Sequence, residues 1–304
     1  MAGQSNEHDI SLRQKAARAQ QQAIQYYRAG NYKDALIEGK KAADIDRSNT
    51  QLQNLVGAIA IETDDPATAV QYLQHSLSIN EHQAETQYLL GNAFIKLDLT
   101  EQAVHAFNYA LTLNPMHANA ALNLGLCLNR LKEAGKAERA FRRAIEIQPN
   151  HPEANNALAE LFIRKTQYDK AEKHAYLAID GDPNRIELIL TLAKALRLQH
   201  RYADAESIYR AALVKHPHNA LLLIEIGSVL REQNNFDDAE KEYEKALEFA
   251  PNSKDVLRSA GAFYQSIRKS ELAAGLYKRY LKLKPHDGGM LNNLAIVLRD
   301  INDF

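Results

Sequence analysis

The sequence predicts an all-α solenoid of helical hairpins, with eight full repeats of 34 residues followed by a single final helix. Two residue types recur at this spacing. A small residue recurs as Ala35, Ala69, Ala103, Ala137, Ala171, Ala205, Ala239 and Ala273. A proline ends the last six full repeats, as Pro115, Pro149, Pro183, Pro217, Pro251 and Pro285. The alternating pattern of a β-strand is absent from the sequence, so we expect helices throughout.

Two successive copies of the pattern in residues 84–151 indicate how one repeat is built. The first copy reads Leu90-Gly91, Phe94, Ala103, Phe107, Ala110 and Pro115, and the second reads Leu124-Gly125, Leu128, Ala137, Phe141, Ala144 and Pro149. Glycine and alanine let two helices approach closely, the aromatic residue fills the space between them, and proline stops the second helix. Each repeat is therefore expected to be a pair of short, closely packed helices.

In both its period and its residue choices, this pattern resembles the tetratricopeptide repeat family, and the register holds from residue 16 to the end of the sequence. The resemblance implies a right-handed superhelix whose first helices line a concave groove. Partner segments in this family usually lie along that groove, so the resemblance also implies a protein-binding function.

Taken in order, residues 1–15 are polar and are expected to be a flexible lead-in and the start of the first helix, with Ser11 as its N-cap. Full units start at residues 16, 50, 84, 118, 152, 186, 220 and 254. The first two depart from the pattern, which is typical of end units that have one face in water. Residues 288–304 match the first helix of a ninth unit or a capping helix. Because the chain stops there at Phe304, we expect a truncation point.

The composition is that of an ordinary soluble protein, with 25% charged residues and a formal net charge of −1. This charge gives no reason to expect nucleic acid or a membrane surface as a partner. The beginning of the chain lacks the apolar region of a secretory signal, and the one cysteine cannot form an internal disulfide. We therefore expect a cytoplasmic protein.

No catalytic or metal-binding motif survives inspection, so we expect neither an enzyme nor a cofactor or metal site. Gly135-Lys136 lacks the upstream glycine of a phosphate-binding loop. His216 and His218 flank a proline without a third ligand nearby, and are expected to be exposed loop residues. Cys127 follows the core pattern of a first helix, which predicts a buried, unreactive thiol.

The resemblance places positions 2, 5, 6, 9, 12 and 13 of each unit on the groove, counted from the first residue of the unit. Several of these positions carry asparagine, namely Asn92, Asn119, Asn123, Asn129 and Asn156, with Asn292 and Asn293 much later in the chain. An amide side chain both donates and accepts hydrogen bonds, so it can pair with the backbone of an extended peptide. The set loosely resembles the asparagine ladder of arrays that precede protein glycosyltransferase domains.

Cations occupy corresponding places in successive units, as Arg130, Arg164, Lys194, Arg197 and Arg231. Arginine suits two-point binding of carboxylates, which favours a partner with an acidic segment. The alternative is that these cations are solvated or paired with the nearby glutamates Glu160, Glu187, Glu225 and Glu232. The sequence leaves both open.

The predicted function is a non-catalytic scaffold that binds a peptide or protein segment in its groove. One alternative is the N-terminal recognition arm of a larger enzyme of the protein glycosyltransferase or sulfotransferase type. A further alternative is a weak homodimer through the helix at 288–304, where Leu291, Leu294 and Leu298 lack a covering helix.

Overall fold

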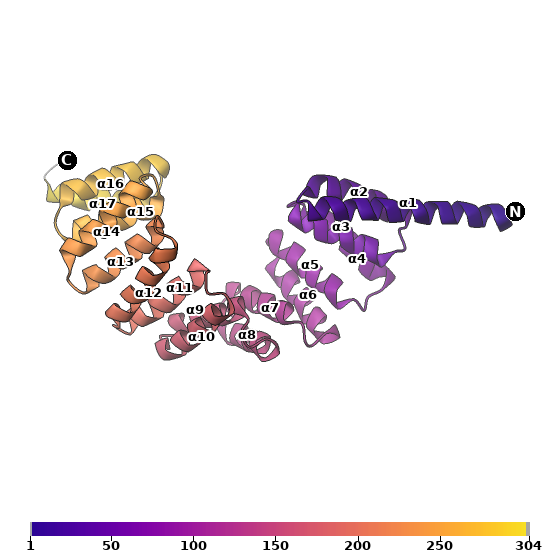
Figure 1. Cartoon of the computed structure of the whole chain (residues 1–304), viewed down its shortest axis with the longest axis horizontal. Coiled ribbons are helices and arrows are strands. Elements are labelled where there is room, and N and C mark those ends of the chain that lie inside the picture. The colour runs from indigo at the N-terminus through magenta and orange to yellow at the C-terminus, as the bar shows by residue number, and fades with distance from the viewer. Residues whose placement is uncertain (1, 302–304) are drawn as a thin grey trace. The chain divides into compact units, whose positions relative to one another are not determined.

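The computed structural model describes the backbone of residues 2–301 and the side chains of residues 12–301 (Figure 1). Within residues 2–301 the chain forms seventeen helices and no strand. The first helices of the repeats are α1 (Ala2–Arg28), α3 (Thr50–Glu62), α5 (Ala84–Lys96), α7 (Ala118–Arg130), α9 (Pro152–Arg164), α11 (Ile186–Leu198), α13 (Ala220–Glu232), α15 (Lys254–Ser266) and α17 (Gly288–Asp300). The second helices are α2 (Tyr32–Ile45), α4 (Pro66–Ile79), α6 (Thr100–Leu113), α8 (Ala134–Ile147), α10 (Tyr168–Gly181), α12 (Tyr202–Lys215), α14 (Phe236–Phe249) and α16 (Ser270–Leu283).

The helices form two compact parts, an N-terminal part up to Leu158 and a C-terminal part from Ala159 onward, so the division falls inside α9. In the N-terminal part, each helix from α1 to α8 contacts the next along the chain. The same holds from α10 to α17 in the C-terminal part. This chain-order contact is the arrangement of a helical solenoid, and it confirms the all-α repeat fold predicted from the sequence.

The first helices from α3 to α17 begin at residues 50, 84, 118, 152, 186, 220, 254 and 288, which are the residues where the 34-residue register starts each unit. The beginning of the chain differs from the expectation. Helix α1 begins at Ala2 and runs through Ser11, so the prediction of an N-cap at Ser11 is wrong. Residues 2–15 contain no proline and one glycine, so the helix can extend upstream of residue 16. Phe304 lies outside the described residues.

The recurring small residues lie in the core. All eight alanines from Ala35 to Ala273 are fully buried at the start of a second helix. A second contact recurs between position 8 of a first helix and position 24 of its second helix, and we call it the seam. A Cβ on Gly91 would lie 2.5 Å from the Phe107 ring, and one on Gly261 would lie 2.5 Å from the Tyr277 ring. At these two seams the aromatic ring thus occupies the space that a Cβ on the glycine would need.

The turn between the two helices of each unit is closed by a residue with positive φ. After Gly30, this position is held by non-glycine residues in seven successive units: Asp64, Asp98, Lys132, Thr166, His200, Asn234 and Arg268, with φ between 58° and 64°. A left-handed residue after a helix satisfies its last carbonyl groups by hydrogen bonds from the turn. Here Lys132 N donates to the Asn129 carbonyl, and Glu133 N donates to the Leu128 carbonyl.

Candidate functional site

Two predicted groove asparagines meet in the N-terminal part. The Asn123 side-chain amide on α7 donates a hydrogen bond of 2.8 Å to the Asn92 side-chain oxygen on α5. This bond uses one acceptor and one donor, so the Asn92 amide nitrogen and the Asn123 oxygen are left for other contacts within the described structure. The pair thus presents a donor and an acceptor side by side, as the backbone of an extended peptide requires.

The other predicted residues of this part are distributed along α7 and α9. Arg130, at the end of α7, forms an ion pair with Asp98, the turn residue of the preceding unit. Lys96 makes the same contact one unit earlier, with Asp64 at 3.0 Å. The Arg130 cation is therefore already paired. Asn129 on α7 and Asn156 on α9 are both half-buried.

In the C-terminal part, α9 and α11 enclose a pocket of about 490 Å³ on their shared face, which we call the groove pocket. Its lining residues are Glu160, Ile163, Arg164, Glu187, Leu190, Thr191 and Lys194. All of them occupy repeat positions that the family resemblance assigns to the groove. Arg164 and Lys194, two of the predicted cations, thus line one pocket together with two carboxylates and two apolar side chains.

Arg197 belongs to the same part of the chain. Its side chain is 24% exposed and lies between two carboxylates. Its guanidinium is 3.8 Å from Glu225 and 3.7 Å from Glu232, both on α13. The Tyr209 hydroxyl donates to Glu225 at 3.4 Å. Burial, and next the charge of Glu225, raise the pKa of Tyr209 above its ordinary value, so the phenol stays neutral. Arg231 also lies on α13. Burial raises the pKa of Tyr243, and the positive charge of Arg231 offsets part of this rise.

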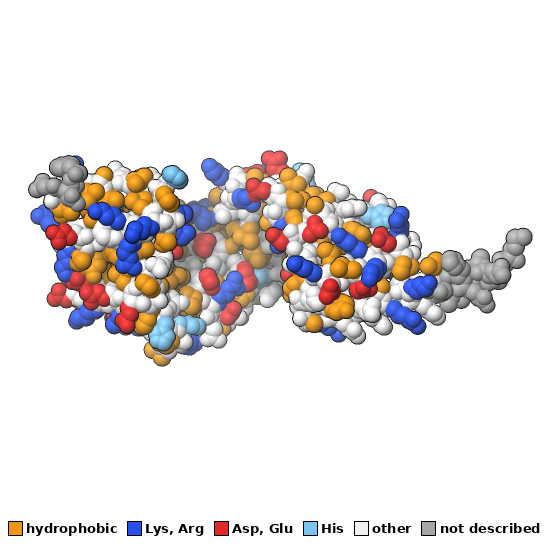
Figure 2. All heavy atoms as spheres, turned by 90° about the horizontal axis from the view of Figure 1, so that it is seen from above, with side chains coloured by type: hydrophobic (Ala, Val, Ile, Leu, Met, Phe, Trp, Pro, Cys, Tyr) orange, Lys and Arg blue, Asp and Glu red, His pale blue; other side chains and the backbone are white. Residues whose placement is uncertain are grey.

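The charges of this surface largely compensate one another. Arg197 faces Glu225 and Glu232, and Arg258 on α15 pairs with Asp255 at 2.9 Å. Figure 2 likewise shows basic and acidic side chains interspersed over the face it presents. Of the two alternatives left open by the sequence, pairing with nearby carboxylates describes Arg197 and, in the N-terminal part, Arg130.

Sequence reasoning missed a row of phenol groups. Tyr209, Tyr243 and Tyr277 hold position 24 in three successive units, where Phe107 and Phe141 stand in earlier ones. Their hydroxyls contact first-helix side chains: Tyr243 with Ser228 at 3.0 Å, and Tyr277 donating to Gln265 at 2.7 Å. The signal was the change from phenylalanine to tyrosine, which implies a polar contact at the tip of a buried ring.

Two kinds of side chain bear on possible chemistry: the Cys127 thiol and groups of potential metal ligands. Cys127 is buried, and burial raises the pKa of its thiol to about 11, which disfavours the thiolate nucleophile. Among the side chains described, no three histidine, cysteine, aspartate or glutamate residues cluster as metal ligands would. A search of the described helices finds none with the length and apolar character needed to cross a bilayer.

Comparisons with known proteins agree with this architecture. A family profile described as tetratricopeptide repeat matches residues 88–152 and 190–254, and a second with the same description matches residues 140–173. None of the curated proteins matches the sequence.

Similar solved structures include a tetratricopeptide repeat protein from Parabacteroides merdae, with a TM-score of 0.67, 16% identity, and coverage of 83% of this chain and 99% of that one. The type IV pilus biogenesis factor PilW has a TM-score of 0.60 and 21% identity, over 66% of this chain and 94% of that one. A chain of the APC/C hetero-tetramer Cut9-Hcn1 has a TM-score of 0.60 and 16% identity, over 91% of this chain and 54% of that one. At these identities the similarity concerns the fold.

Proposed function

The chain is a tetratricopeptide repeat protein, and we propose that it is a non-catalytic scaffold that binds a segment of another protein along the surface of its first helices. The groove pocket is the observation that carries this proposal. Its lining comes from α9 and α11 only, and it combines the apolar side chains Ile163 and Leu190 with charged side chains at the rim. The lining thus offers both an apolar contact surface and hydrogen-bonding groups, the two kinds of contact that a binding site combines.

The charged residues of the lining also indicate the chemistry of the bound segment. Arg164 and Lys194 supply N–H donors, whereas Glu160 and Glu187 supply acceptors. A segment with an acidic side chain can bind to the two cations, and the two apolar side chains can contact a neighbouring aliphatic side chain. In the N-terminal part, Asn92 and Asn123 are placed to pair with peptide backbone rather than with charge.

The test is a pull-down from cells that contain the protein, using the wild type and an Arg164→Glu/Lys194→Glu double variant. Arg197→Glu is unsuitable here, because it would place a third carboxylate against Glu225 and Glu232 and would destabilise the fold. The matched control is Lys173→Glu/Lys278→Glu on the exposed faces of α10 and α16. A protein captured by the wild type and the control, and lost with the groove variant, supports the proposal. Equal capture by all three contradicts the groove assignment.

A recognition arm of a larger enzyme is the second candidate, and the Asn92–Asn123 pair favours it because amide pairs bind substrate peptides through their backbone. Activity separates the two candidates. The arm should increase turnover of a peptide substrate when joined to a catalytic domain encoded by the same gene, and an Asn92→Ala/Asn123→Ala variant should abolish that increase. A gene that encodes no such domain removes this candidate.

Self-association through α17 rests on a difference in exposure. Leu291 is 47% exposed, whereas Leu223 and Leu257, at the same repeat position in α13 and α15, are at most 1% exposed. An exposed leucine on an otherwise apolar helix face favours a weak homodimer. Sedimentation equilibrium should show concentration-dependent association that Leu291→Asp abolishes, and a strict monomer at high concentration would exclude it.

A further inference from the structure

The second helices of the C-terminal part carry a pocket that the groove does not include. It has a volume of about 470 Å³ and lies between α12 and α14, and we call it the outer pocket. Its apolar lining consists of Leu213, Val214, Pro217, Leu223 and Phe249. Because the pocket is built mainly from second helices, it belongs to a different surface from that of the groove pocket.

Val214 stands out among these residues. Its side chain is 83% exposed, so it contributes little to packing of the core. The equivalent position in the other full units is polar throughout, as Asp44, Ser78, Thr112, Glu146, Asp180, Glu248 and Lys282. Nearby, Phe249 is 42% exposed, with His218 against its ring at 4.7 Å between centroids. The fold thus tolerates polar residues at position 29, and this unit instead presents an apolar one to solvent.

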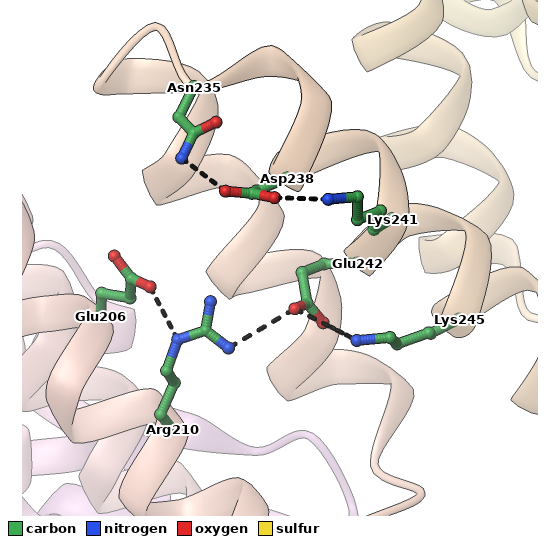
Figure 3. Close-up of polar contacts among 7 residues, drawn as sticks. All are labelled: Glu206, Arg210, Asn235, Asp238, Lys241, Glu242 and Lys245. Carbon is green, nitrogen blue, oxygen red and sulfur yellow. Dashed lines mark hydrogen bonds and ion pairs between the residues drawn. The ribbon is translucent and has the colours of Figure 1, made fainter.

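The polar end of the outer pocket is built on a buried acid. Glu242 on α14 is only 6% exposed, at a repeat position where six of the other seven full units have an uncharged residue. Arg210 on α12 and Lys245 on α14 each contact its carboxylate at 3.4 Å (Figure 3). Charge-assisted bonds of this kind are usually about 2.7–2.9 Å long, so both contacts are loose.

The more exposed hydrogen-bonding groups at this end are donors. Arg210 has five N–H groups, and within the described structure its Nε donates to Glu206 at 2.7 Å and its Nη1 to Glu242. Among the side chains that the structure describes, Lys245 directs its ammonium to Glu242 alone. Asp238, one turn before Glu242 on α14, is already held by Asn235 at 2.9 Å and Lys241 at 2.8 Å (Figure 3). Both cations are about half exposed, so their unused N–H groups are accessible at the pocket rim.

We propose that the outer pocket is a second docking site, and that its occupant is a protein segment with a large apolar side chain next to an aspartate or glutamate. The apolar side chain fills the space beside Val214 and Phe249. The carboxylate accepts hydrogen bonds from the unused N–H groups of Arg210 and Lys245. These cations are more exposed than the carboxylates of Glu206 and Glu242 with which they pair, so the charge that an incoming segment meets first is positive. A basic segment would instead meet two half-exposed cations, and this disfavours it.

The test uses a phage library that displays random dodecapeptides, selected on the wild-type protein. The decisive variant is Val214→Asp, which installs the residue that two other units carry at this position and so should leave the fold intact. Met116→Asp is the matched control, since Met116 is an exposed apolar residue of the N-terminal part. Enriched peptides should pair a large apolar residue with Asp or Glu. Their affinity for Val214→Asp should be about tenfold lower than for the wild type. Their affinity for Met116→Asp should equal that for the wild type.

A charge variant tests the second half of the proposal. Lys245→Gln leaves Glu242 paired with Arg210. It should lower the affinity for acidic peptides about threefold. Peptides that bind the wild type and Val214→Asp equally, or no enrichment at all, would overturn the site. Peptides that depend on Val214 but carry Lys or Arg beside the apolar residue would overturn the carboxylate assignment. Peptides whose binding is lost only in Arg164→Glu/Lys194→Glu bind to the groove pocket. The experiment therefore tests the outer pocket independently of the groove pocket.

Discussion

The Tyr277 ring occupies the space that a side chain on Gly261 would need, since a Cβ on this glycine would lie 2.5 Å from the Cε1 atom of the ring. The ring cannot move aside easily. It is fully buried, and its hydroxyl donates to Gln265 at 2.7 Å. The glycine on α15 and the tyrosine on α16 therefore determine together how closely the two helices of this unit pack.

Gly261→Ala should accordingly lower the free energy of unfolding by about 1–3 kcal/mol, the usual cost of overpacking. The control is Gly275→Ala on α16, where an added Cβ meets no atom within 4 Å. That change should raise stability by about 0.5–1 kcal/mol, because alanine favours the helix interior more than glycine does. Urea unfolding of both variants checks the pair, and equal effects would contradict the packing argument.

The left-handed turn residues give a second prediction. Lys132 has a φ of 62°, a conformation that costs an ordinary L-residue about 1–2 kcal/mol. Lys132→Gly should relieve part of this cost and stabilise the protein by about 1 kcal/mol. Gly30 holds the same turn position with a φ of 74°, which suits glycine. Gly30→Ala should therefore destabilise the protein by a similar amount. Thermal unfolding measures both, and changes of the same sign would refute the explanation.

Cys127 gives a pH-dependent prediction. Burial, offset slightly by the charge of Arg130, raises the pKa of its thiol from the ordinary 9.0 to about 11. Below pH 9 the thiol is neutral in both folded and unfolded chains, and its contribution to stability is fully present. Between pH 9 and about 11 only the unfolded chain ionises, so this contribution is lost as pH rises.

The measurement is urea unfolding at pH 8 and pH 10 for the wild type and Cys127→Ala. The wild type should lose more stability over this interval than the variant, because only the wild type carries the titrating thiol. The folded wild type should also react slowly with a thiol reagent at pH 8, and rapidly once unfolded. Identical pH dependence in both proteins would show that Cys127 is not protected by burial.

Much of the fold could be predicted from the sequence because the repeat pattern and the packing coincide. Ala137 and Ala171 recur at the residue where two helices approach, and both are fully buried. The start of α1 could not be predicted in the same way. Residues 2–10 lack the apolar periodicity from which a helix is predicted, so the sequence pattern gives no start for α1 at Ala2.

The candidate site was less predictable, because repeat position shows which face a side chain occupies but not which group it contacts. Arg164 and Arg197 both lie on first helices of the C-terminal part. Arg164 lines the groove pocket, whereas Arg197 is placed between two carboxylates of α13. The contacts of the two arginines differ because each arginine faces the first helix of the following unit, and the residues of that helix differ between the two units. Val214 was missed because a single valine in a mixed helix has no periodic signal.

The most direct test of the scaffold function is site-specific photo-crosslinking in cells that contain the protein. A photoreactive amino acid at Lys194, at the rim of the groove pocket, should give a discrete crosslink to another protein. The same amino acid at Lys173, exposed on α10, should not. A crosslink from Lys194 alone is the predicted result. No crosslink from Lys194, or the same product from both positions, would contradict binding along the first helices.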